Sequence, residues 1–122
     1  MDASDKVAVG TEGRTERRID SSLLTRHVGG EGLFATPSMI LLMEQTAHSS
    51  VAPRLPEGYT TVGYEVCVRH LAPAQAGETV VVASRLKEVD RNRLLFDVEC
   101  SKDGKVIGTG THRRAIVPAP SP

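Results

Sequence analysis

One stretch near the middle of the chain is apolar on every side of the helix that it predicts. Residues 39–43 read Met-Ile-Leu-Leu-Met, and a helix that is apolar all round is enclosed by the rest of its domain. Thr36 can cap this helix, and Pro37 fits the first helical position because its missing N–H has no intrahelical partner. Pro53 ends the helix, since proline disfavours helical geometry in the residue before it. We therefore expect a helix from Thr36 to about Val51.

The chain after this helix has the pattern of an antiparallel sheet. β-branched residues dominate several runs, and short polar turns separate them. Asp103-Gly104 is a strong hairpin signal, because a type I′ turn needs positive φ at both central positions. A further strand is expected before the helix, between Thr15 and Val28. The four strands expected after the helix are residues 60–71, 79–89, 94–101 and 105–117.

This order of elements predicts an α+β hot-dog fold. One long central helix that is apolar all round needs an antiparallel five-stranded sheet wrapped around it. Because one such sheet covers only part of its helix, we expect a homodimer whose sheets join edge to edge, with a dimer of dimers as a further state. We expect a loose N-terminal arm over residues 1–14, a single domain over residues 15–117 and a proline-rich tail over residues 118–122.

Composition excludes several classes of partner. In a chain of 122 residues, 15 basic and 15 acidic residues cancel, which gives no support for nucleic acid or an acidic membrane as a partner. No segment approaches the roughly 20 apolar residues that a membrane-spanning helix needs. Cys67 and Cys100 lie in predicted strands without metal-type spacing, so we expect buried free thiols and a cytoplasmic location.

Glu44 is the residue whose placement in this helix calls for a functional explanation. A desolvated carboxylate holds a proton more readily, which suits a general base or nucleophile near neutral pH. The structural alternative is a buried glutamate satisfied by backbone or water, or one at a dimer seam. The apolar residues that share its side of the helix are Ile40, Leu41, Ala47 and Val51.

Three more residues have both a structural and a functional interpretation. His70 ends a predicted strand beside a loop, where it is either a surface histidine or a cleft residue able to orient water or protonate a leaving group. Thr36 is a helix cap, a nucleophile or a hydrogen-bond donor to Glu44. About 12 Å along the helix axis separates these two residues. If both act on one substrate, they bracket it, come from different protomers or are linked by water. Gly63 is an ordinary strand glycine or a backbone donor to a developing oxyanion.

No metal or cofactor site is expected. Glu44 and His48 are spaced i, i+4 on one helix face, but His27 and His112 are far away in sequence and no third ligand is evident. The segment Gly29-Gly30-Glu31-Gly32 is either a simple linker or a mobile entrance flap.

The motifs, taken in order, resemble the fluoroacetyl-CoA thioesterase family of hot-dog acyl-CoA thioesterases. The resemblance implies hydrolysis of an acyl-CoA to a free acid and CoA, without a cofactor. It implies catalytic roles for Thr36, Glu44 and His70, and substrate binding by Gly63, Arg114 and Phe34. Arg69, Arg113 and Arg114 are candidates for the CoA phosphates, because arginine forks suit phosphate. The motifs are Phe34-Ala35-Thr36, Leu42-Met43-Glu44, Gly63, Val68-Arg69-His70, Gly108-Thr109-Gly110-Thr111-His112 and Arg114.

Two departures from the family pattern shape the functional hypothesis. The segment before Phe34 lacks the bulky aromatic residues associated with selection of the fluorinated acyl group, and Pro37 replaces a small residue after the threonine. We therefore expect a thioesterase for a small or short acyl-CoA, in which Glu44 activates water with assistance from Thr36 and His70. One alternative is a non-catalytic protein that binds acyl-CoA or an acyl carrier, and another is hydratase or dehydratase chemistry.

Overall fold

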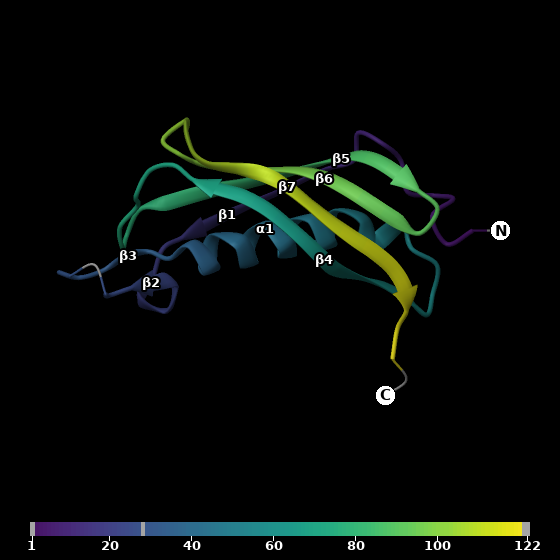
Figure 1. Ribbon diagram of the computed structural model, residues 1–122, viewed down its shortest axis with the longest axis horizontal. Helices are drawn as coiled ribbons and strands as arrows, with labels where there is room; N and C mark the ends of the chain where they lie inside the picture. Colours follow the sequence, from purple (N-terminus) through teal and green to yellow (C-terminus); the bar gives the residue numbers. More distant parts are fainter. Residues whose placement is uncertain (1, 28, 121–122) are drawn as a thin grey trace.

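The structure is a computed structural model that describes residues 2–27 and 29–120. Its single long helix, α1 (Thr36–Val51), has the bounds that the sequence predicts. Figure 1 shows α1 lying beneath a curved sheet, with both chain ends at one end of the molecule. The expected arrangement of one helix wrapped by a sheet is confirmed.

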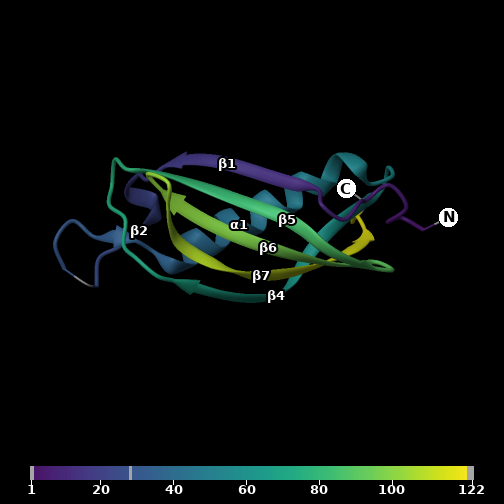
Figure 2. The same cartoon turned by 90° about the horizontal axis from the view of Figure 1, so that it is seen from above.

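The sheet has five antiparallel strands in the order β1-β5-β6-β7-β4, so β1 and β4 form its two edges (Figure 2). A two-stranded ladder of β2 (Leu24–Thr25) and β3 (Leu33–Phe34) lies at the end where α1 begins. The 3₁₀ turn Ser21–Leu23 precedes β2, and the 3₁₀ turn Ala52–Arg54 follows α1. The strands of the main sheet are β1 (Glu12–Arg18), β4 (Tyr59–His70), β5 (Thr79–Asp90), β6 (Arg93–Lys102) and β7 (Lys105–Pro118).

The core lies between α1 and the concave face of the sheet. Met39, Met43 and Val51 are fully enclosed, and they face buried side chains of the central strands such as Val82 and Phe96. The expectation that α1 is enclosed on every side is wrong at Leu41, whose exposed fraction is 51%. One side of the helix, next to strand β4, is therefore left open by the single chain.

The N-terminal part of the chain differs from its prediction. β1 begins at Glu12, inside the segment that we expected to be a loose arm, and Val7 is part of the core. The strand expected up to Val28 ends at Arg18, because Asp20 accepts a hydrogen bond from the backbone N–H of Ser22 at 2.9 Å and starts a 3₁₀ turn. Val28 itself lies outside the described residues.

At the other end, the backbone N–H of Ala119 donates to the carbonyl of Gly58 at 2.8 Å. The proline-rich tail is therefore held to the neighbouring loop through its second residue. Within residues 2–27 and 29–120, the structure contains no helix long and apolar enough to cross a membrane.

Candidate active site

Thr36 and His70 form a hydrogen-bonded pair at the start of the helix. Ala35 occupies the N-cap position, so Thr36 is the first helical residue and Pro37 the second. The Thr36 hydroxyl lies 2.9 Å from Nδ1 of His70 and makes no capping bond to the helix. The expectation that Thr36 caps the helix is therefore wrong, and its hydroxyl is directed to a residue 34 positions away.

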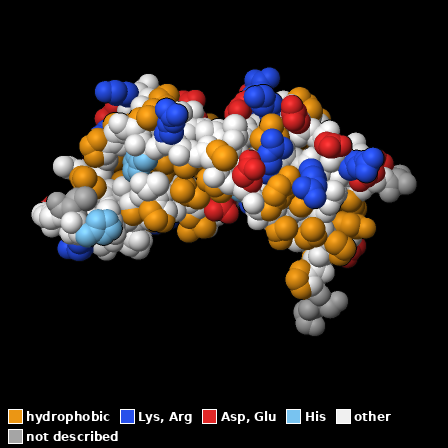
Figure 3. All heavy atoms as spheres, viewed as in Figure 1, with side chains coloured by type: hydrophobic (Ala, Val, Ile, Leu, Met, Phe, Trp, Pro, Cys, Tyr) orange, Lys and Arg blue, Asp and Glu red, His pale blue; other side chains and the backbone are white. Residues whose placement is uncertain are grey.

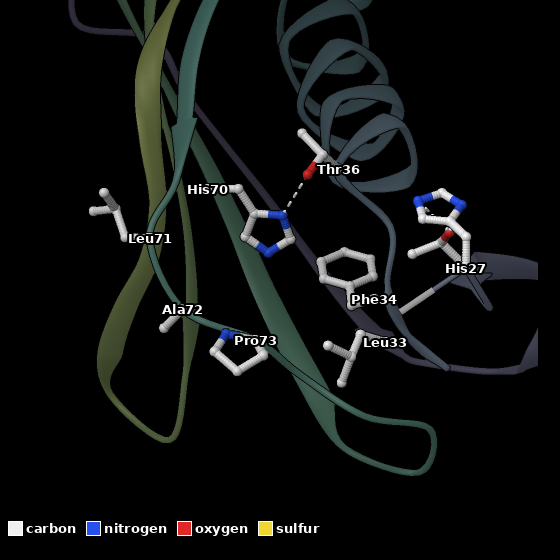
Figure 4. A pocket seen from close by; sticks show the side chains of 9 residues that line it. His27, Leu33, Phe34, Thr36, His70, Leu71, Ala72 and Pro73 are labelled. Atoms are coloured by element: carbon white, nitrogen blue, oxygen red, sulfur yellow. Dashed lines mark hydrogen bonds between the residues drawn. The ribbon is translucent and has the colours of Figure 1, made fainter. Parts of the chain in front are cut away.

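A pocket of about 370 Å³ opens beside this pair. Phe34 contacts the His70 ring edge to face, with centroids 5.8 Å apart, and Figure 4 shows His70, Thr36 and Phe34 pointing toward one another. The second ring nitrogen of His70, Nε2, is buried and has no partner among the described residues. Partial burial holds the pKa of His70 below its usual value, so the ring is neutral at pH 7. The pocket is lined by Thr25, His27, Leu33, Phe34, Thr36, His70, Leu71, Ala72 and Pro73.

Glu44 does not line this pocket. It lies in a second depression beside β4. It is half-buried, and it shares this depression with His48, Thr61 and Arg114. The apolar surroundings that the sequence suggested for Glu44 are therefore incomplete, because a buried arginine faces the carboxylate. The positive charge of Arg114 and the negative charge of Glu44 act on each other across this depression.

Gly63 is the point at which this second group converges. A methyl group on Gly63 would lie 3.2 Å from Oε2 of Glu44, 3.1 Å from Nη1 of Arg114 and 2.9 Å from Cε1 of His112. The register of β4 against β7 shifts between Gly63 and Glu65, and such a bulge redirects the strand locally. Because these contacts are shorter than ordinary van der Waals distances, only glycine lets the three groups approach in this arrangement.

Arg114 is part of this cluster rather than of a cleft mouth. Its exposed fraction is 7%, and its Nε and Nη2 groups donate to the hydroxyl and carbonyl oxygens of Thr61 at 2.8 and 2.9 Å. The expectation that Arg114 binds the CoA phosphates does not agree with this burial. Arg113 forms an ion pair of 3.0 Å with Glu65 on the outer face of the sheet.

Sequence reasoning considered two histidines of this cluster only as possible metal ligands or motif residues and gave them no place beside Glu44. His48 Nδ1 lies 2.7 Å from the hydroxyl of Thr61, and buried His112 contacts Arg114. In the sequence, His112 is far from Glu44. The pairing of β4 with β7 brings it there, since Val66 of β4 lies opposite His112.

A single chain thus presents two separate half-sites. Thr36, His70 and Phe34 line one pocket, while Glu44 and Arg114 line the other, with Gly63 at its edge. In the part of the chain that the structure describes, no three His, Cys, Asp or Glu side chains come together as they would around a metal ion.

Comparison with known proteins identifies the family. The family model described as fluoroacetyl-CoA-specific thioesterase matches residues 19–120. The chain belongs to this family. A fluoroacetyl-CoA thioesterase from Streptantibioticus cattleyicolor is 38% identical over 85 residues, which cover 70% of this chain and 61% of that protein.

The fold is also similar to those of solved structures. One structure of the fluoroacetyl-CoA thioesterase FlK is 31% identical, with a TM-score of 0.85 over 93% of this chain and 90% of the other. A hot-dog-like protein from Thermanaerovibrio acidaminovorans is 26% identical, with a TM-score of 0.87 over 98% and 90% of the two chains. The hot-dog fold expected from the order of elements is therefore confirmed.

Proposed function

We propose that this protein hydrolyses a small or short acyl-CoA to a free acid and CoA. The observation that carries the proposal is the Thr36–His70 pair, which lines an open pocket and whose buried Nε2 has no partner among the described residues. Membership of the fluoroacetyl-CoA thioesterase family supports the same reaction.

The pair supplies a hydrogen-bond donor for the departing sulfur. Neutral His70 with its proton on Nε2 accepts a hydrogen bond from the Thr36 hydroxyl at Nδ1, so the buried Nε2–H is the donor left for a substrate. Water attacks the thioester carbon and transfers a proton to the Glu44 carboxylate as the C–O bond forms. The C–S bond then breaks, and the departing CoA sulfur takes up the proton held by Glu44, which restores the carboxylate, while Nε2–H of His70 donates a hydrogen bond to the sulfur. The backbone N–H of Gly63 stabilises the oxyanion between these two steps.

Because one chain keeps the two half-sites apart, we propose that the active unit is a homodimer. β4 is an edge strand with one side unpaired, and antiparallel pairing of two β4 edges places the end of one strand beside the start of the other. This pairing brings His70 toward Glu44 and Gly63 of the partner subunit.

The face that carries β4 supports this arrangement. Figure 3 shows hydrophobic side chains gathered across its middle and lower part, next to a hollow. An edge strand with apolar side chains on both faces is a site for pairing with another chain. The exposed apolar residues of β4 and the adjacent helix and loop are Leu41, Tyr59, Val62, Tyr64, Val66 and Leu71.

The acyl group is proposed to be small, without strong selection for fluorine. The segment between β2 and β3 contains three glycines and no Phe, Tyr or Trp, and His27 is the one described residue of this segment among those that line the pocket. Phe34 is the aromatic residue that contacts the proposed reaction centre.

Thiol release from a panel of acetyl-, fluoroacetyl-, longer-chain and aromatic acyl-CoA tests the proposal. We expect the wild type to release CoA from the short acyl thioesters and Glu44→Gln to be strongly impaired. Equal turnover by both proteins would remove Glu44 from the mechanism. Saturable binding of acyl-CoA without thiol release over hours would instead indicate a binding protein.

A further inference from the structure

His112 lies in the Glu44 cluster, and the reaction proposed above does not use it. The side chain comes from β7, and its exposed fraction is 1%. Each ring nitrogen has one partner: Nδ1 is 2.8 Å from the carbonyl oxygen of Glu65, and Nε2 is 3.1 Å from Nη1 of Arg114.

These two partners permit only one protonation state of the ring. A carbonyl oxygen only accepts hydrogen bonds, so Nδ1 carries the hydrogen, and a guanidinium group only donates, so Nε2 is the acceptor. The neutral Nδ1–H form therefore satisfies both bonds. The other neutral form and the doubly protonated ring would each direct an N–H at the N–H groups of Arg114.

The hydrogen bond that Arg114 donates to His112 completes the anchoring of the guanidinium group. Two other guanidinium nitrogens already donate to Thr61, so all three nitrogens of the group are held. Nη1 and Oε2 of Glu44 approach the same point above Gly63. Among the described residues, Glu44 and Arg114 form no direct ion pair, so a gap separates the two charged groups.

We propose that His112 is a positioning residue that fixes the Arg114 guanidinium opposite Glu44. The part of Glu44 in hydrolysis rests on the function proposed above. The charged groups around the ring are Arg114 on its own strand and Glu44 on α1, whereas the Glu65 side chain of β4 is paired with Arg113. On β6 the residue opposite His112 is the apolar Phe96.

The first test measures protonation and rotation directly in the ¹⁵N-labelled full-length protein at pH 7.5. Two-bond histidine spectra are expected to show His112 with a protonated Nδ1 and a bare Nε2. The Arg114 side chain is expected to give separate Nη signals, as a guanidinium does when its rotation is blocked. A protonated Nε2, or a single averaged Nη signal, would overturn the proposal.

The second test compares His112→Gln with His112→Leu. An amide oxygen replaces the acceptor for Arg114, whereas leucine leaves Nη1 without a partner. We expect kcat of His112→Leu to fall roughly 10- to 100-fold, as for one lost hydrogen bond to a charged group, with KM changed by less than about twofold. His112→Gln is expected to recover most of this loss. Val82→Ala, a change at a buried residue of β5, controls for lost stability.

The outcomes separate this proposal from the function on which it rests. Wild-type kcat in His112→Leu, or an equal loss in both variants at equal melting temperature, would overturn the positioning role. If the wild-type protein hydrolyses no acyl-CoA, the proposed function fails. The Arg114 signals then decide the inference, because they are expected to merge in His112→Leu and to stay separate in His112→Gln. If His112→Leu does not fold, separate signals in His112→Gln support the proposal and merged signals overturn it.

Discussion

Replacing Gly63 with alanine is expected to slow the reaction while leaving the fold intact. The added methyl group would lie 2.9 Å from Cε1 of His112, 3.1 Å from Nη1 of Arg114 and 3.2 Å from Oε2 of Glu44. Carbon atoms in good contact are about 3.5 Å apart or more, so at least one of these groups must move by roughly 0.5 Å. The displaced groups are Glu44, which we propose as the base, and the Arg114 and His112 side chains that face it.

The size of the effect follows from this displacement. A misplacement of 1 Å in a catalytic group costs on the order of 100-fold in rate, so roughly 0.5 Å corresponds to about 10-fold, or about 1.4 kcal/mol of activation free energy. Stability should change little. Alanine gains about 0.4–1 kcal/mol over glycine through the unfolded state, which offsets part of the strain, and β4 is an edge strand that can shift.

The assay is kcat for thiol release from acetyl-CoA, with thermal unfolding measured on the same samples. Gly63→Val extends the series, because its larger side chain should displace the same groups further and lower kcat again. Glu99→Ala, on the exposed face of β6, is the control and should match the wild type. Unchanged kcat in Gly63→Ala would refute the reasoning, since it would mean that the spacing around Gly63 does not matter for the reaction.

Four further predictions concern the Thr36–His70 pair, the proposed dimer, the buried histidines and the two cysteines. Thr36→Ala should lower kcat by roughly 2- to 10-fold through loss of the hydrogen bond to neutral His70, and Thr36→Ser should retain most activity; full activity in Thr36→Ala would exclude the pair from the reaction. Val66→Lys should convert a dimer to monomers in light scattering and abolish turnover, whereas Val9→Lys, at a distant exposed valine, should do neither; turnover by monomers would refute the shared site. Burial holds the pKa values of His48, His70 and His112 below the usual value. Below about pH 6.5 the unfolded state therefore binds more protons than the folded state, and the urea midpoint of unfolding should fall as the pH drops. An equal midpoint at about pH 8 and about pH 5.5 would contradict this. Burial raises the pKa of the Cys100 thiol to about 11, so a thiol reagent should label exposed Cys67 in the native protein and Cys100 only after unfolding; native labelling of Cys100 at the same rate would contradict this.

The helix and the strands after it were predictable because their signals are local. Apolar residues on every side, a proline in the first turn and a proline after the last turn determine α1. Period-two patterns and the Asp103-Gly104 turn determine β5 to β7. The N-terminal boundaries were less predictable, because β1 owes its start to pairing with β5 rather than to its own sequence.

The sequence by itself also selected Thr36, Glu44, His70 and Gly63 as functional candidates. It did not determine how these residues group, because that depends on contacts between distant parts of the chain. Thr36 turns from the helix backbone to His70 across 34 positions, and His112 reaches Glu65 across 47. Such contacts follow from the register of β4 against β7 and from the packing of α1 beneath them. For this reason only the tertiary structure shows Thr36 paired with His70, Arg114 buried beside Glu44, and the two half-sites held apart within one chain.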